Sequence, residues 1–333
     1  MQPLVSILIP AYNAEKWLAD TIRSALQQTW PHKEVIVIDD GSNDRTLVVA
    51  RKFESLGVKV FSQSNQGPVA ARNAAYSQSR GEYIQWLDAD DLLEPGKVAA
   101  QIVEAAKAAD KHLLLSCAWG SFYALPQKAT FVPSPLWADL TPVEWLLRKM
   151  QSGCFMQTAT WLVSRELSEA AGPWDPRMLV DNDGEYFCRV LLKSTGVRFV
   201  KDARVLYRRP NVRSVSFIGN SRGKMDAHLL SCELHLKYIR SLEDSQRVRT
   251  ACNTFLKAQM SHSRPWMPEH VERAKQLFLS VDGQFEPHPL NWPYSWIQKL
   301  GGPQMANAVR SRVPHLIRSV KRVCERVAYR FGG

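Results

Sequence analysis

The first third of the chain alternates between short apolar runs and segments with helical spacing. The apolar runs are at 4–9, 34–40, 58–63, 82–87 and 112–118, and we expect them to be strands with apolar residues on both faces. The segments between them show apolar residues at helical spacing or many alanines. They are 17–26, the segment from the end of the second run to about residue 55, 68–79 and 96–109. This alternation predicts an α/β fold with a mostly parallel central sheet flanked by helices.

After residue 118 the alternation weakens. We expect a helix near 142–150, a strand running into a helix over 155–167, a helix over 183–194 and a strand near 197–201. From about residue 220 the pattern is helical. We therefore divide the chain into an α/β domain over 1–215 and a helical C-terminal region over 216–333.

Polar side chains follow each of the first four predicted strands. The strands end in "PAYN", "DDGS", "QSNQG" and "DADD". Because the carboxyl ends of parallel strands meet at one edge of a sheet, and ligands bind there, we expect this edge to hold the functional site.

The most acidic of these strand ends is Asp88-Ala89-Asp90. Two carboxylates at this spacing suit a hard divalent cation, Mg²⁺ or Mn²⁺, which keeps coordination positions for phosphate oxygens. A metal here would indicate a nucleotide diphosphate as substrate. Short acidic triplets also occur as solvated turns, so both interpretations stay open on this motif alone.

Two further residues at this edge favour a nucleotide ligand. Asp40 can accept a hydrogen bond from a base N–H or a ribose hydroxyl, although it also suits an ordinary turn. Arg72, in an alanine-rich helix, can pair with a carboxylate or a phosphate. We interpret Asn13, and Ser42 or Asn43, as caps of the helices that follow them.

The net charge of +11 and the pI of about 9.4 indicate an anionic partner: nucleic acid, acidic lipid or a phosphorylated small molecule. Zinc, RNP and helix-turn-helix patterns do not occur in the sequence, which argues against a nucleic-acid-binding module. The six cysteines are scattered and form no CxxC pair, so we expect free thiols in a reducing compartment.

The N-terminus resembles no signal peptide, and apolar runs stay short of the roughly 20 residues that a spanning helix needs. We therefore expect a cytoplasmic protein. Residues 306–333 carry seven Lys or Arg against one Glu, a net +6, on a helical pattern with one apolar face. This segment suits either the anionic inner face of a membrane or packing on its own domain with a solvated basic face.

Four motifs, in order and spacing, resemble the family-2 inverting glycosyltransferases with the GT-A fold: "VSILIPAYNAEKWLADTIRSALQQTW", "EVIVIDDGSNDRT", "NQGPVAARNAA" and "YIQWLDADD". The resemblance covers roughly 1–215. It implies a bacterial-type enzyme that transfers a sugar from a nucleotide-diphospho-sugar, with a UDP-sugar expected, to a saccharide or lipid-linked acceptor. A nucleotide-binding half would span about 1–117 and an acceptor half about 118–215.

The resemblance also assigns contacts to the donor and its metal ion. The residues concerned are Pro10, Ala11, Tyr12, Asp40, Arg72, Asp88, Ala89 and Asp90. In this assignment Asp88 contacts the ribose and serves as a second metal ligand, and Asp90 binds the Mg²⁺ or Mn²⁺ on the diphosphate. Asp91 matches no fixed role, and we expect it to cap the next helix or to lie in a solvated turn.

An inverting transfer needs one carboxylate near the acceptor as general base. Counting back from Arg189 in "DNDGEYFCRVL", the resemblance implies Asp183 as the base. Asn182 stands where an acidic residue is more common, so Asp181 remains an alternative. Both acids would also suit the N-terminus of the helix that starts here.

The stretch "VLYRRPNVRSVSF" at 205–217 resembles a segment that closes over the diphosphate. The segment contains Arg208, Arg209 and Arg213, with Ser214 and Ser216 beside them. These cations would either offset the charge of the leaving group or belong to a basic surface loop. Two other functions remain open for the chain as a whole. One is a nucleotidyltransferase, which would release pyrophosphate, and the other is a catalytically silent homologue that binds a nucleotide or a membrane.

Overall fold

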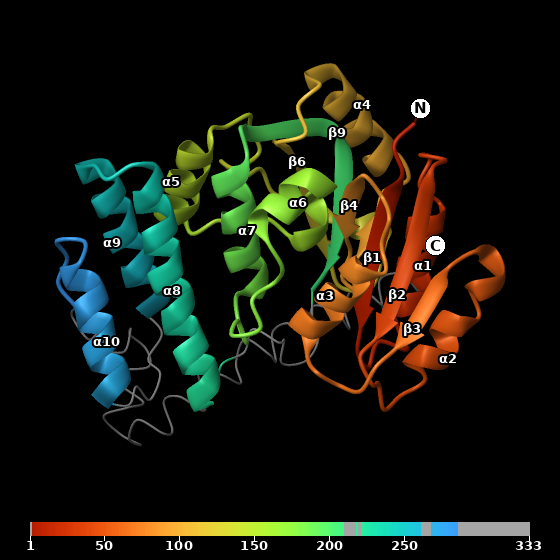
Figure 1. The fold of residues 1–333 in the computed structure, drawn as a ribbon, viewed down its shortest axis with the longest axis horizontal. Helices are drawn as coiled ribbons and strands as arrows, with labels where there is room; N and C mark the ends of the chain where they lie inside the picture. Colours follow the sequence, from red (N-terminus) through yellow and green to blue (C-terminus); the bar gives the residue numbers. More distant parts are fainter. Residues whose placement is uncertain (1, 210–217, 219–220, 261–267, 286–333) are drawn as a thin grey trace.

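The computed structural model describes residues 2–209, 218, 221–260 and 268–285. Its first sheet has the order β3-β2-β1-β4-β8 (Figure 1). The bounds are β1 Val5–Ala11, β2 Lys33–Asp39, β3 Lys59–Ser62, β4 Tyr83–Trp86 and β8 Val163–Ser164. The first four strands are parallel, as predicted, and β8 pairs antiparallel with β4.

Helices join the parallel strands at the predicted places. They are α1 Leu18–Leu26, α2 Thr46–Arg51 with the short 3₁₀ turn η1 Glu54–Leu56, and α3 Pro68–Ser77. Helix α4 Lys97–Ala108, also at its predicted place, precedes the apolar run at 112–118. Helix α1 buries Leu18, Ile22 and Ala25, the stripe that its spacing indicates. Apolar residues of the strands and of these helices form the cores on the two faces of the sheet.

The predicted helix caps are wrong. Helix α1 begins after Trp17 and α2 after Arg45, and neither has a side-chain cap. Asn13 instead accepts a hydrogen bond from the backbone N–H of Asn43 at 2.9 Å, and its own N–H donates to Ser42 Oγ at 3.0 Å. These side chains therefore join the loops that follow β1 and β2, where the sheet edge carries the expected site.

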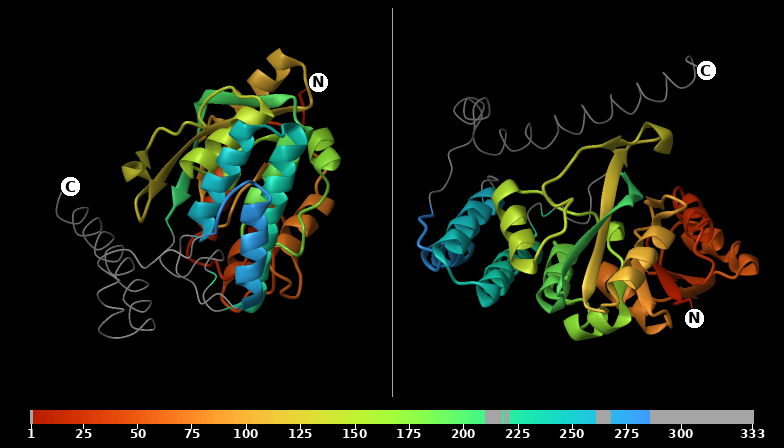
Figure 2. Two further views of the ribbon diagram at one scale, coloured as in Figure 1. Left: turned by 90° about the vertical axis from the view of Figure 1, so that its left-hand side faces the viewer. Right: turned by 90° about the horizontal axis from the view of Figure 1, so that it is seen from above.

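The apolar run at 112–118 belongs to a second sheet, which corrects the prediction of one central sheet. That sheet has the order β5-β9-β6-β7. Its strands are β5 Leu92–Leu93, β6 Leu113–Phe122, β7 Thr130–Phe131 and β9 Gly196–Arg208. The strand expected at 197–201 is the first part of β9, which pairs parallel with β6 and shifts its register after Cys117. Figure 2 shows β6 and β9 between the first sheet and the C-terminal helices.

The remaining elements are helical. They are the 3₁₀ turns η2 Pro126–Lys128 and η3 Thr158–Thr160, and the helices α5 Pro142–Ser152, α6 Arg165–Ala171, α7 Asn182–Lys193, α8 Arg222–Leu242, α9 Gln246–Met260 and α10 Pro268–Leu279. Helices α8 and α9 lie beside α5 and α7, opposite the end that holds α2 (Figure 1). One apolar cluster joins them, with Leu146, Val190, Leu229 and Leu256 among its members.

Some expectations concern residues that the structure does not describe. The basic segment 306–333 lies outside the described residues, as do Arg213, Ser214, Ser216 and Cys324. The five cysteines within the described part are free thiols. None of the helices over the described residues combines the length and the hydropathy that crossing a membrane requires.

Candidate active site

The parallel register brings the predicted strand ends to one edge of the first sheet. Ala11 at the end of β1 lies opposite Asp39 at the end of β2, and its carbonyl accepts the N–H of Asp40 at 2.9 Å. Strand β4 pairs with the other side of β1, so Asp88, Ala89 and Asp90 follow on the same edge. The Tyr12 side chain beside them is 48% exposed and available to a ligand.

The Asp40 carboxylate is buried, with 2% exposure, and shapes the loop between β3 and α3. It accepts hydrogen bonds from the N–H groups of Gln66 at 3.0 Å and Gly67 at 2.8 Å, and from Gln63 Nε2 at 2.8 Å. These contacts fix the loop that leads to Arg72. Contact between Asp40 and a nucleotide stays a prediction.

The neighbouring Asp39 is a candidate that sequence reasoning did not single out. Its Oδ2 accepts from Ser62 Oγ at 3.2 Å, whereas Oδ1 is buried without a hydrogen-bond partner among the described residues. A buried acceptor without a donor is costly, so a ligand N–H or O–H would be stabilised there. The sequence alone could not separate two adjacent aspartates at the end of one strand.

Arg72 joins the strand edge to the start of α7. Its buried guanidinium forms an ion pair with Asp88 Oδ1 at 2.8 Å and donates to Asn182 Oδ1 at 3.0 Å. It also lies 4.5 Å from the centre of the Trp174 ring, a favourable cation–π distance. Of the partners expected for Arg72, a carboxylate or a phosphate, the structure shows the carboxylate.

Asp90 and Asp91 have different surroundings although they are adjacent. Burial and the charge of Asp88 raise the pKa of Asp90 to about 6. Asp91 is fully buried and accepts hydrogen bonds from Gln157 Nε2 and from the Arg208 N–H, the latter at 2.8 Å. The expectation of a helix cap or a solvated turn is therefore wrong for Asp91, which joins the loop before η3 to the end of β9.

Arg208 is also buried, with 3% exposure, so the surface-loop interpretation is wrong for this residue. Its Nε donates to the Asp90 carbonyl at 2.9 Å. Its guanidinium lies over the rings of Trp17 at 4.2 Å and Phe122 at 4.5 Å. A cation thus stands beside the acidic motif, as the leaving-group interpretation of this segment expects.

Asp183 lies in the first turn of α7, next to the Asn182 that Arg72 contacts. Burial and the charge of Asp181 raise the pKa of Asp183, against the opposing effect of Arg72 and Lys149. Thr158 Oγ1 lies 3.5 Å from Asp183 Oδ2. The structure therefore brings Asp183, Arg72 and the strand edge into one region.

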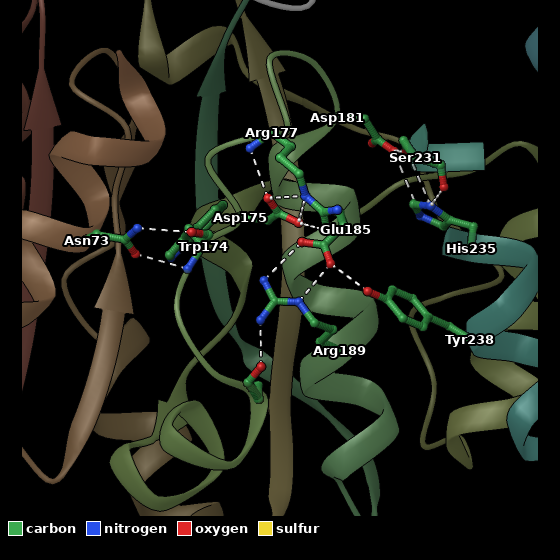
Figure 3. A network of polar contacts seen from close by, with 11 residues as sticks. Asn73, Trp174, Asp175, Arg177, Asp181, Glu185, Arg189, Ser231, His235 and Tyr238 are labelled. Carbon is green, nitrogen blue, oxygen red and sulfur yellow. Dashed lines mark hydrogen bonds and ion pairs between the residues drawn. The ribbon is translucent and has the colours of Figure 1, made fainter. Parts of the chain in front are cut away.

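The other acids near Asp183 are engaged elsewhere. Asp181 Oδ2 accepts a hydrogen bond from Ser231 on α8. Glu185 is buried, forms an ion pair with Arg189 at 2.7 Å and accepts from the Tyr238 hydroxyl at 2.8 Å. Figure 3 shows the surroundings of Asp181 and Glu185. Glu185 therefore has two structural partners, Arg189 on its own helix and Tyr238 on α8.

A divalent metal ion fits this edge if its ligand shell is completed by substrate. No group of three or more metal-binding side chains occurs within the described residues. Asp88 and Asp90 offer oxygen ligands, but Asp88 shares its charge with Arg72. Mg²⁺ commonly uses one or two carboxylates together with water and substrate phosphates, so two aspartates suffice.

An aromatic cluster lies beside the acidic residues, formed by Trp119 on β6, Phe155, and Tyr207 on β9. The Trp119 ring centre lies 5.0 Å from that of Phe155 and 5.7 Å from that of Tyr207. Phe155 is 51% exposed. Gln157 and Thr158, shortly after it in the chain, contact Asp91 and Asp183. Sequence reasoning missed this cluster because its members come from separate segments without a shared motif.

Comparisons with known proteins agree with this geometry. Residues 6–152 match the model of the glycosyl transferase family 2. An uncharacterized glycosyltransferase of Rickettsia typhi is 31% identical over 202 residues, which are 58% of this chain and 60% of that protein. A chondroitin synthase of Escherichia coli is 42% identical over 119 residues, 35% of this chain and 17% of that enzyme. The chain thus spans 60% or less of these two relatives.

A solved structure shows the same fold. The crystal structure of S. aureus TarS 1-349 in complex with UDP-GlcNAc superposes with a TM-score of 0.61 at 19% identity. The superposition covers 98% of this chain and 92% of that one. The predicted resemblance to the family-2 glycosyltransferases is confirmed by the family model that matches residues 6–152, and the predicted fold class is confirmed by the superposition.

Proposed function

We propose that the protein is an inverting glycosyltransferase that moves a sugar from a UDP-sugar to a hydroxyl of a saccharide or lipid-linked acceptor. The observation that carries the proposal is the pair of contacts made by Arg72, which links Asp88 on the strand edge to the turn that holds Asp183. Solved TarS structures with UDP and UDP-GlcNAc support a UDP-sugar as donor.

The proposed reaction is a single displacement. Asp183 accepts the proton of the acceptor hydroxyl as its oxygen attacks the anomeric carbon, and the bond from that carbon to the diphosphate breaks on the opposite face. Arg72 and Arg208 provide positive charge near the leaving diphosphate. Among the acids at the start of α7, we favour Asp183 because Asp181 is bonded to Ser231.

Asp90, together with Asp88, would hold a Mg²⁺ or Mn²⁺ ion. When bound, the ion would offset negative charge on the diphosphate oxygens. The ion pair with Arg72 limits the repulsion between the two aspartates, so that both remain suitable as ligands. Pro10, Ala11, Tyr12 and Asp40 remain the proposed contacts of the uridine, from the ends of β1 and β2.

A thermal-shift panel tests the donor class. UDP-sugars with Mn²⁺ should raise the melting temperature more than GDP- or dTDP-sugars, because the ligand with the lowest Kd stabilises the native state most at a given concentration. A ligand at 100 times its Kd stabilises it by about 2.7 kcal/mol. Product analysis then separates the functions. Release of UDP supports transfer, pyrophosphate would indicate a nucleotidyltransferase, and binding without turnover would indicate a silent homologue.

We expect the aromatic cluster to bind the acceptor, because the apolar face of a sugar ring can stack on an exposed aromatic side chain. Phe155→Ala should raise KM for a p-nitrophenyl glycoside acceptor about tenfold, equivalent to about 1.4 kcal/mol of binding. The KM for the donor should stay unchanged. Leu56→Ala removes an exposed apolar side chain from η1 and serves as the control. An unchanged acceptor KM in Phe155→Ala would place the acceptor elsewhere.

A further inference from the structure

Helix α8 forms hydrogen bonds with two residues at the start of α7, one before and one after Asp183 in the sequence. Ser231 and Tyr238 are seven residues apart, about two turns, so they lie on one face of α8. Ser231 Oγ donates to Asp181 Oδ2, and the Tyr238 hydroxyl donates to Glu185 Oε1 at 2.8 Å. Figure 3 shows both contacts. The two acids they reach stand two residues before and two residues after Asp183.

The backbone at Asp181 needs this support. Its φ of 53° is left-handed, a conformation that costs a residue other than glycine about 1 kcal/mol or more. Its carbonyl accepts the Glu185 N–H at 3.0 Å. A Cβ on Gly184 would lie only 2.1 Å from Asp181 Oδ1, so the carboxylate packs against the residue that follows Asp183. The orientation of the Asp181 side chain and the shape of the turn are therefore set together.

A buried chain of polar groups extends this contact to α5. His235 Nδ1 lies 2.8 Å from the Ser231 carbonyl, and Nε2 lies 3.0 Å from Lys149 Nζ. Because a carbonyl only accepts and an ammonium only donates, Nδ1 carries the proton and Nε2 accepts from Lys149. Burial lowers the pKa of His235 to about 3, so the ring stays neutral.

Lys149 provides a lasting positive charge behind this chain. Burial alone would lower its pKa, but Cys188, Asp181 and Asp183 outweigh that effect, and the pKa of Lys149 is raised. The charged groups that face Asp183 are therefore Asp181 from its own turn, Arg72 from α3 and Lys149 from α5. A buried polar chain adds less to stability than well-packed apolar residues would, so its presence suggests a role beyond folding.

We propose that Lys149, His235, Ser231 and Asp181 form a positioning chain that orients the first turn of α7 and so directs Asp183 toward the acceptor. The inference rests on the proposed function, because it concerns the same general base. It gives the helical C-terminal region a part in the active site: α8 holds the base in place without contacting substrate.

Ser231→Ala in the full chain tests the inference. We expect kcat for sugar transfer to fall about tenfold, the cost of losing about 1.4 kcal/mol of orientation, while the donor KM and the thermal shift with UDP stay unchanged. Ser241→Ala is the matched control, because the Ser241 hydroxyl, also on α8, donates to the Tyr238 carbonyl of its own helix at 2.7 Å. This control should retain the wild-type kcat.

A second comparison separates positioning from a loss of folded protein. If Ser231 acts through Asp183, then Ser231→Ala should cause no further loss of rate in an Asp183→Asn background. Lys149→Met gives the same test with Ser231 and Asp181 intact, should Ser231→Ala fail to fold. A wild-type kcat in both Ser231→Ala and Lys149→Met overturns the inference. It is also overturned if Ser231→Ala lowers the rate as much in the Asp183→Asn background as in the wild type. Absence of transfer by the wild-type chain would instead refute the proposed function.

Discussion

Asp183→Asn is expected to lower kcat for sugar transfer by about a thousandfold, within the range of 10² to 10⁴ that a general base contributes. Asparagine has nearly the shape of aspartate but cannot take a proton from the acceptor hydroxyl. The change leaves the Arg72 contacts to Asp88 and Asn182 in place, so UDP should still bind. Steady-state kinetics and a thermal shift with UDP measure the two properties separately.

Asp181→Asn is the matched control, because an asparagine at 181 still offers an oxygen to Ser231. Its kcat should stay within about tenfold of wild type, because the variant loses only the negative charge of Asp181, which strengthens the hydrogen bond from Ser231. An inactive Asp181→Asn beside an active Asp183→Asn would make Asp181 the base.

The pH dependence provides a further check on Asp183. A general base works only when deprotonated, so kcat should fall as the pH drops through its pKa. Since burial and Asp181 raise the pKa of Asp183 above its ordinary value of 3.8, this fall should occur at a higher pH than an exposed aspartate would give. In Asp183→Asn the part of the acid limb that belongs to Asp183 should be lost, and any limb that remains would belong to Asp90, whose pKa burial and Asp88 raise to about 6.

Asp90→Asn should lower transfer by more than a hundredfold, because a metal ion contributes several kcal/mol of charge stabilisation to such reactions. EDTA should reduce the wild-type enzyme to a similar rate. Added Mn²⁺ should restore the wild type fully and the variant little or not at all.

Asp244→Asn is the control, since it replaces an exposed aspartate that pairs with Arg240 and lies outside the strand edge. Full activity of the wild type in EDTA would contradict metal dependence, and so would a fully active Asp90→Asn. Arg72 and Arg208 would then be the cations left to offset the charge of the diphosphate.

The strand edge could be predicted from the sequence because local patterns encode it. The apolar runs of β1, β2 and β4 end in Pro, Gly or Asp, and parallel pairing then brings these ends together. The burial of Asp91 could not be predicted in this way. Its partners Gln157 and Arg208 lie 66 and 117 residues further along the chain, and the residues near Asp91 indicate neither.

The second sheet and the contacts of α8 could not be predicted from the sequence for the same reason. The run at 112–118 has the pattern of any buried strand, and only its pairing with β9 assigns it to another sheet. Ser231 and Tyr238 look like ordinary positions of a helix. Their contacts with Asp181 and Glu185 span 50 and 53 residues, so no local spacing indicates them.

The double contact of Arg72 has a thermodynamic consequence. One guanidinium serves both Asp88, where the donor is expected, and Asn182, beside the proposed base. If donor binding weakens the ion pair between Arg72 and Asp88, the hydrogen bond from Arg72 to Asn182 should change with it, and the binding of donor and acceptor would then be coupled. Such coupling is reciprocal. If the sugar nucleotide changes the affinity for the acceptor by a certain factor, the acceptor changes the affinity for the sugar nucleotide by the same factor.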